Sequence, residues 1–241
     1  LKHDVRAAMW WCIVPAVISV ALVGLVKDPH ARRARRGDAA EAPAAVSRGG
    51  TSEVLPTRFW VVCVPLVVVA VVNFSDALLL LRVLELGFST TQVVLAYVVF
   101  NAVYTLGSYP AGSLSDRWPR ALVYAVGLAA FCVGYIGLGV VHRGAGVFVL
   151  LAVYGLFPAF TDGVGKAWVS ALVPRTQRGH AQGVFQALNN AAVLVAGLWA
   201  GLLWNVGAGD GAIPLVVAGT VAGVAALGLV TAGLRSGRRP A

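Results

Sequence analysis

The stretch GSLSDRWPR, residues 112–120, interrupts a chain that otherwise runs in long apolar blocks. It places one acid and two arginines within a few residues of each other, with a glycine before them and a proline among them. Of the 241 residues, 59% are hydrophobic and only 12% are charged, whereas soluble domains carry about 25% charged residues. The blocks on either side of the stretch therefore belong in lipid, and we predict that the stretch itself is a tight turn at the membrane surface.

Seven apolar runs in the chain are long enough to cross a bilayer as helices, which takes about 20 residues. We place them at residues 7–26, 59–81, 90–112, 120–141, 146–172, 179–205 and 211–234. A single segment in lipid must satisfy its own backbone hydrogen bonds, so helix is the expected structure. The predicted fold class is an all-α, polytopic membrane protein, with a basic flexible linker at 27–58 and a tail at 235–241.

The positive charges outside the spans are distributed unevenly between the two sides of the membrane. Fourteen Lys and Arg residues fall on the side of the linker and the tail, and four fall on the other side. The positive-inside rule then makes the linker and the C-terminus cytoplasmic and leaves the N-terminus outside. This topology in a bacterial plasma membrane explains the net charge of +9 better than nucleic-acid binding does.

Polar side chains within the spans are the candidates for a solute cavity, because such groups in lipid face a bundle interior or a water-filled path. The runs at 7–26, 120–141 and 211–234 contain no Asn, Gln, Asp, Glu or Lys, so we expect them to support the others. The candidate cavity residues are Asn73, Asp76, Asn101, Gln186, Asn189 and Asn190. The alternative is that these amides join helices to one another by hydrogen bonds.

Three charged residues allow more specific interpretations. Asp76 is a candidate protonation site, or alternatively a partner of Arg82 outside the membrane. Asp162 and Lys166 are one helical turn apart, which predicts a structural charge pair. The three cysteines lie in apolar runs without metal-ligand spacing, so we expect no metal site. We also expect no cofactor and no catalytic residue, and we classify the chain as a non-enzyme.

The opening stretch resembles the G-x-x-x-D-R-x-x-R turn of the major facilitator superfamily, with Gly112, Asp116, Arg117 and Arg120 at the marked positions. In that family the motif joins the second and third helices of each six-helix half and acts as a cytoplasmic gate. A second stretch, DGVGKAWVSALVPRTQRGHAQGVFQALNN at 162–190, resembles the family's turn between helices 10 and 11. The residues before Arg120 depart from the family pattern, since Trp118 and Pro119 stand where a glycine is usual.

The resemblance implies a division of the chain into four parts. Residues 1–26 would be helix 6, residues 27–58 the loop between the two halves, residues 59–234 the six-helix C-terminal half, and residues 235–241 the cytoplasmic tail. Family members have about twelve helices, so helices 1–5 of the same protein are the expected partner, together with the lipid bilayer and a small-molecule substrate.

The function that follows is secondary active transport of a small solute by alternating access, with proton coupling as an option. Two alternatives remain open. One is a truncated fragment without transport activity of its own. The other is a seven-helix receptor-like protein, although the last span has no lysine of the kind that binds retinal.

Overall fold

The computed structural model describes residues 17, 54–142, 144–207 and 209–236, so the predicted span at 7–26, most of the linker and the end of the tail lie outside the described residues. All regular secondary structure in the described part is helical, which confirms the predicted fold class. The helices are α3 (Thr57–Ala70), α4 (Asp76–Glu85), α5 (Thr90–Arg117), α6 (Arg120–Val140), α7 (Gly146–Ala171), a 3-10 turn η1 (Arg175–Gln177), α8 (Arg178–Leu203) and α9 (Ala212–Ser236). Five of these, α5 to α9, have the length and apolar composition of membrane spans, so the protein is a multi-pass membrane protein.

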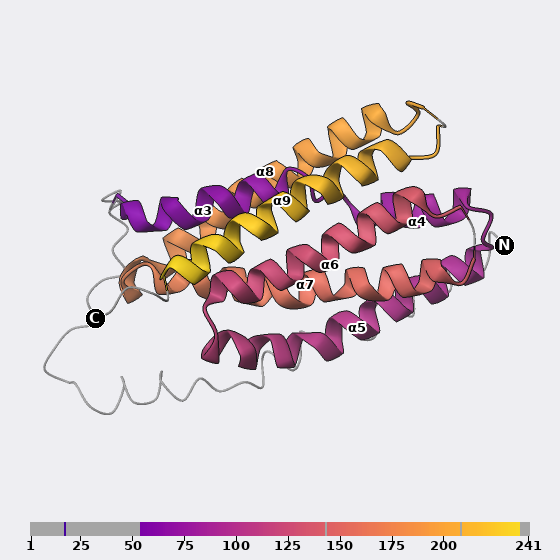
Figure 1. Cartoon of the computed structure of the whole chain (residues 1–241). Coiled ribbons are helices and arrows are strands. Elements are labelled where there is room, and N and C mark those ends of the chain that lie inside the picture. The colour runs from indigo at the N-terminus through magenta and orange to yellow at the C-terminus, as the bar shows by residue number, and fades with distance from the viewer. Residues whose placement is uncertain (1–16, 18–53, 143, 208, 237–241) are drawn as a thin grey trace, which may run out of the picture. The chain divides into compact units, whose positions relative to one another are not determined.

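Helix α6 packs along both α7 and α9, α5 packs along α7, and α3 packs along α8 (Figure 1). Glycines let some of these helices approach closely. A Cβ added at Gly155 of α7 would lie 2.7 Å from the carbonyl oxygen of Phe100 in α5, and one at Gly134 of α6 would lie 2.8 Å from Tyr154 Cβ in α7. Buried aromatic rings fill the space between α6 and α7, and Phe131 stacks on Tyr135 with ring centroids 3.9 Å apart. This packing fixes α7 between α5 and α6, and α7 contributes side chains to both cavities described below.

The span predicted at 59–81 is wrong as one continuous helix. It is broken at residues 71–75 into α3 and α4, which together have about the length of one membrane crossing. Ser75 caps the second piece by accepting a hydrogen bond from the Ala77 backbone N–H at 3.3 Å. Trp199 Nε1 donates to the carbonyl of Val71 at 2.8 Å, so that α8 satisfies a backbone group that the break leaves free.

The opening stretch also differs from the predicted turn, because most of it is helical. Helix α5 continues through Gly112 and Asp116 to Arg117, and α6 begins at Arg120. A residue before proline is excluded from helical backbone angles by contact with the proline ring. Trp118 is accordingly extended, with φ −107° and ψ 156°, so the real turn is only Trp118 and Pro119.

At the opposite end of the helices, the side chain of Arg82 connects three segments. It is 3% exposed and donates hydrogen bonds to the carbonyls of Leu138, Gly139 and Val141 at the end of α6. It also donates to the carbonyl of Asp210 and forms an ion pair of 2.5 Å with its carboxylate, ahead of α9. We call this set of contacts the Arg82 lock.

The Arg82 lock also changes the acidity of Asp210. Burial alone would raise the pKa of Asp210, but the hydrogen bonds from Arg82 and from the Ala212 backbone N–H, together with the charge of Arg82, outweigh it. The net result is a pKa below the ordinary value for aspartate.

Candidate functional site

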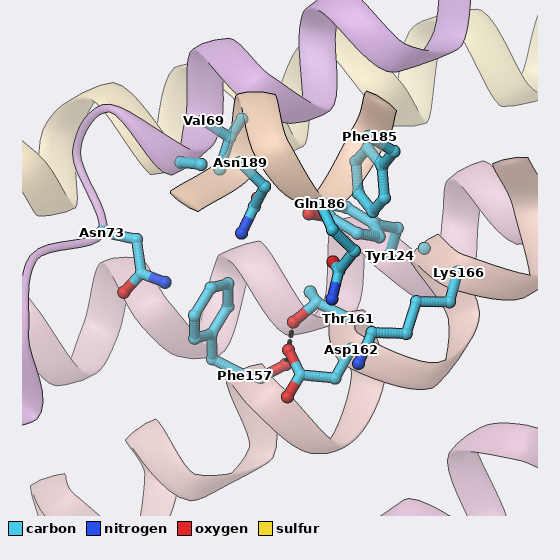
Figure 2. Close-up of a pocket in the computed structure, with 12 residues that line it drawn as sticks. Val69, Asn73, Tyr124, Phe157, Thr161, Asp162, Lys166, Phe185, Gln186 and Asn189 are labelled. Carbon is cyan, nitrogen blue, oxygen red and sulfur yellow. Dashed lines mark hydrogen bonds between the residues drawn. The ribbon is translucent and has the colours of Figure 1, made fainter. Parts of the chain in front are cut away.

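Two adjoining cavities lie among the helices, and the first is lined by polar side chains from α7 and α8. We call it the amide cavity; its volume is about 70 Å³. Figure 2 shows Gln186 and Asn189 reaching from α8 toward Thr161 and Asp162 of α7, with Asn73 of the break between α3 and α4 at one side. The break therefore brings a polar side chain to the cavity at the point where the helix is interrupted.

The amides separate into two groups by their hydrogen bonds. The side chains of Asn73, Gln186 and Asn189 form no hydrogen bond with any described residue, so they do not join helices together there. Gln182, one turn earlier on α8, is different, because its Nε2 donates to the carbonyl of Lys166 and to Ser170 Oγ, both at 2.6 Å. Gln182 therefore ties α8 to α7, while the three unbonded amides leave donors and acceptors for a solute or for water.

The second cavity is larger, about 240 Å³, and we call it the aromatic cavity. Five aromatic rings and two carboxylates line it, along with two amides and a proline: Tyr97, Phe100, Tyr104, Tyr154, Phe157, Asp76, Asp162, Asn73, Asn101 and Pro158. The Tyr154 hydroxyl donates to Asp76 Oδ1 at 2.8 Å, and the Tyr104 hydroxyl donates to Asp162 Oδ2 at 3.0 Å. Asn73, Phe157 and Asp162 line both cavities, so the two form one continuous candidate site.

The remaining predicted cavity residues differ in whether they line a cavity and in what they bind; they are Asn101, Asn190 and Asp76. Asn101 lines the aromatic cavity, but its Nδ2 donates to the Tyr97 carbonyl of its own helix at 2.8 Å. Asn190 is exposed and lines none of the cavities described. Asp76 lies in the aromatic cavity, and the alternative partner considered for it, Arg82, is bound to Asp210 instead.

The predicted charge pair between Asp162 and Lys166 is not formed, since no ion pair within 4.0 Å joins them in the described part of the chain. Both side chains line the amide cavity one turn apart on α7 (Figure 2). Asp162 accepts its hydrogen bond from Tyr104 of α5. The cavity offers these charges a polar neighbourhood, which removes the need for mutual pairing that a lipid-facing position would impose.

The predicted gate residues lie at the end of α5 and the start of α6. Gly112 has no atom within 4 Å of the position a Cβ would take, so no described segment packs closely on it. Asp116 and Arg117 are exposed and form no side-chain hydrogen bond or ion pair with the residues described here. Arg120 Nη1 lies 3.4 Å from the carbonyl of Ala167, to which it donates near the end of α7.

The aromatic residues of the site were not predicted from the sequence. The tyrosines at 97, 104 and 154 lie in apolar runs, where they are indistinguishable from ordinary packing residues. One signal was available in the spacing of Tyr97, Asn101 and Tyr104, which at i, i+4 and i+7 share one helix face with a polar residue. No group of three or more His, Cys, Asp or Glu residues in the described ranges is placed to hold a metal ion.

The sequence profile of the Major Facilitator Superfamily matches residues 77–241, more than half of the chain. The chain therefore belongs to the major facilitator superfamily, which confirms the resemblance found in its sequence.

Two curated relatives come from the archaeon Methanocaldococcus jannaschii. The uncharacterized MFS-type transporter MJ1317 is 32% identical over 110 residues, which are 46% of this chain and 28% of that protein. The uncharacterized MFS-type transporter MJ1560 is 24% identical over 127 residues, or 53% of this chain and 32% of that protein. The chain thus matches less than a third of the length of these relatives, and no solved structure matches it.

Proposed function

We propose that the chain is the C-terminal part of a secondary transporter that moves a small solute across the membrane. The observation that carries this proposal is the pair of connected cavities among apolar helices of membrane-spanning length. The side chains of Asn73, Gln186 and Asn189 reach it without a protein partner in the described residues. Polar groups among membrane helices carry a free-energy cost and mark solute or ion pathways.

We further propose that transport proceeds by alternating access between this part and a preceding set of helices. Among the five candidate spans, α5 and α8 have the smallest share of buried residues, 17% of the apolar window of each. Exposed apolar residues such as Leu106 and Leu198, at 76% and 61%, leave an extended face for further helices of the same protein. In this division residues 59–234 form the six-helix C-terminal half, and Gly112, whose Cβ position has no atom within 4 Å, is available to a helix of the other half.

The proposed location is the plasma membrane, with the turn at Trp118 and Pro119 on the cytoplasmic side. The helix ends next to the turns on this side carry Arg117, Arg120, Arg175 and Arg178. The Arg82 lock lies at the other end, which we assign to the outside. This assignment follows the positive-inside rule.

Water accessibility of the amide cavity tests the proposed pathway. In a chain whose own cysteines are replaced, Gln186→Cys and Asn189→Cys are treated with a membrane-impermeant thiol reagent in vesicles. Thr220→Cys is the matched control, because Thr220 is an exposed polar residue within α9 and lines none of the cavities described. We expect labelling at 186 and 189 and little at 220; the opposite pattern would contradict the proposed path.

Reconstitution separates the transporter from its two alternatives. Solute flux into vesicles is measured for residues 1–241 alone and for the chain together with the N-terminal helices of its parent protein. Flux only in the second case supports the fragment interpretation, and flux in the first case contradicts it. Absence of flux in both, with a ligand-induced signal to a cytoplasmic partner, would favour the receptor-like alternative.

A further inference from the structure

We propose that the aromatic cavity binds an organic cation, either a protonated amine or a quaternary ammonium group on an apolar body. This proposal rests on the proposed transport function and names the class of substrate. It starts from the charges of the cavity wall. Asp76 and Asp162 both line it, and no Lys, Arg or His of the described residues does.

No described cationic side chain forms an ion pair with either carboxylate. Asp76 accepts from the Tyr154 hydroxyl and Asp162 accepts from the Tyr104 hydroxyl, each at about hydrogen-bond length. An ionised carboxylate offers roughly four acceptor positions, so each retains free ones. A neutral ligand would not offset the negative charge of these carboxylates in their ionised form, and an anion would be repelled by it, whereas a cation lowers the cost of burying it.

The aromatic wall is suited to the rest of such a ligand. Phe100 stacks on Tyr97 and on Tyr154, with ring centroids 5.6 and 5.2 Å apart. Tyr97 lines the aromatic cavity together with Asp76 and stays 40% exposed, so part of its side chain remains free for a ligand. Aromatic faces attract cations, and they do so more strongly where water is excluded.

Two other ligands fit the wall less well. A divalent metal such as Ca²⁺ needs roughly six to eight oxygen ligands. The described residues hold no group of three or more His, Cys, Asp or Glu side chains that could bind one. A sugar could stack on the rings, but it would not offset the two negative charges. Of the two cavities, Lys166 lines the amide cavity and not the aromatic one, and it lies one turn beyond Asp162. Its positive charge repels a cationic ligand from that end of the site.

The test uses three probes of nearly one shape and different charge. Phenyltrimethylammonium is the cation, tert-butylbenzene is its neutral isostere, and benzenesulfonate is the anion. Binding to the full chain in lipid nanodiscs is followed by saturation-transfer NMR, with empty nanodiscs subtracted. We expect saturable binding of the ammonium probe and no saturable binding of the other two.

Variants then assign the binding to this cavity. Asp76→Asn combined with Asp162→Asn is expected to weaken ammonium binding by about tenfold or more, since charge-assisted contacts are stronger than neutral ones. Lys166→Met is expected to tighten it by removing a positive charge from the adjoining cavity. Glu85→Gln is the matched control, because Glu85 lies outside the cavities and its Oε1, which accepts from Trp204, has a counterpart in glutamine.

Circular dichroism and unfolding midpoints show that each variant is folded, and single Asp→Asn variants replace the double variant if it is not. The proposal is overturned if the neutral or anionic probe binds as well as the cation, if no probe binds, or if the Asp variants leave binding unchanged. Flux of a neutral solute in the reconstitution experiment would leave the transport function standing even then, so the two failures are distinguishable.

Discussion

Replacing Arg82 by methionine tests the Arg82 lock, which is the main polar contact between α4, the end of α6 and the segment before α9. Methionine keeps a long flexible side chain in the buried position and removes all donors. The carbonyls of Leu138, Gly139 and Val141 and the Asp210 carboxylate then lose the guanidinium. The perturbation is therefore almost purely the loss of charge and hydrogen bonds.

Two independent arguments give similar values for the free energy of unfolding that Arg82→Met loses. The guanidinium makes four hydrogen bonds and one ion pair. At about 0.6 kcal/mol for each polar contact among membrane helices, these give a loss of about 3 kcal/mol. Removing one partner of a buried ion pair costs about 3–5 kcal/mol in soluble proteins, and Asp210, whose side chain is 34% exposed, favours the lower end of that range.

The assay is equilibrium unfolding of the chain in detergent micelles, followed by far-ultraviolet circular dichroism. Arg58→Met is the matched control, because Arg58 is exposed near the start of α3 and forms no ion pair within the described residues; its change should stay within about 0.5 kcal/mol. Arg82→Lys should fall between the two, since one ammonium group cannot reach all the acceptors that the planar guanidinium reaches. Equal stability of Arg82→Met and the natural chain would refute the reasoning.

The Arg82 lock should also make the stability of the protein depend on pH. The folded protein holds the pKa of Asp210 below its ordinary value, so the contribution of this carboxylate to stability is complete at pH values above about 4. It is lost as the pH falls through the lower pKa of the folded state, because the protonated group no longer pairs with Arg82. Asp210→Asn should remove this part of the acid sensitivity, and an unchanged acid profile would show that other groups cause it.

Two further predictions concern packing and can be checked by the same unfolding measurement. Trp199→Phe leaves the Val71 carbonyl at the helix break without its donor and should cost about 0.6–1.7 kcal/mol; an unaltered midpoint would mean that water replaces the indole. Gly155→Ala would bring a Cβ to 2.7 Å from the Phe100 carbonyl and should cost about 1–3 kcal/mol by forcing α5 and α7 apart, whereas Gly163→Ala on the same helix meets nothing within 4 Å and should gain up to about 1 kcal/mol. Equal effects of the two alanines would contradict the close approach inferred at 155.

The positions of the helices were largely predictable, because hydrophobic length is the dominant signal for a chain in lipid. The ends predicted for α6 to α9 lie within a few residues of those observed. The break at 71–75 was missed for the same reason, since a window of apolar residues averages over Asn73 and Ser75. The sequence Ser75-Asp76 is a helix-start signal, and giving it more weight than hydropathy would have located α4.

The site was predictable only in its polar half. Gln186 and Asn189 were found because amides are conspicuous in a membrane span, but hydropathy could not separate them from Gln182, which serves helix packing, or from Asn190, which is exposed. Whether an amide lines a cavity depends on the helix that faces it, and that is information the helix itself does not contain. The same limit applies to Tyr104, whose role became visible only through its hydrogen bond to Asp162.

The short helix α4 connects the two parts of the molecule on which these experiments act. Asp76 at its start lines the aromatic cavity, and Arg82, six residues later, forms the Arg82 lock about 9 Å away along the helix. Because the contacts of Arg82 all go to the end of α6 and to Asp210, α4 is tied to α6 and to the segment before α9, while residues 71–75 separate it from α3. If α4 moves relative to α3, the chain bends at 71–75 and the Arg82 lock stays intact; if α4 moves relative to α6, the lock breaks. The first route leaves the interactions worth about 3 kcal/mol intact, so we expect it to be the one the protein uses.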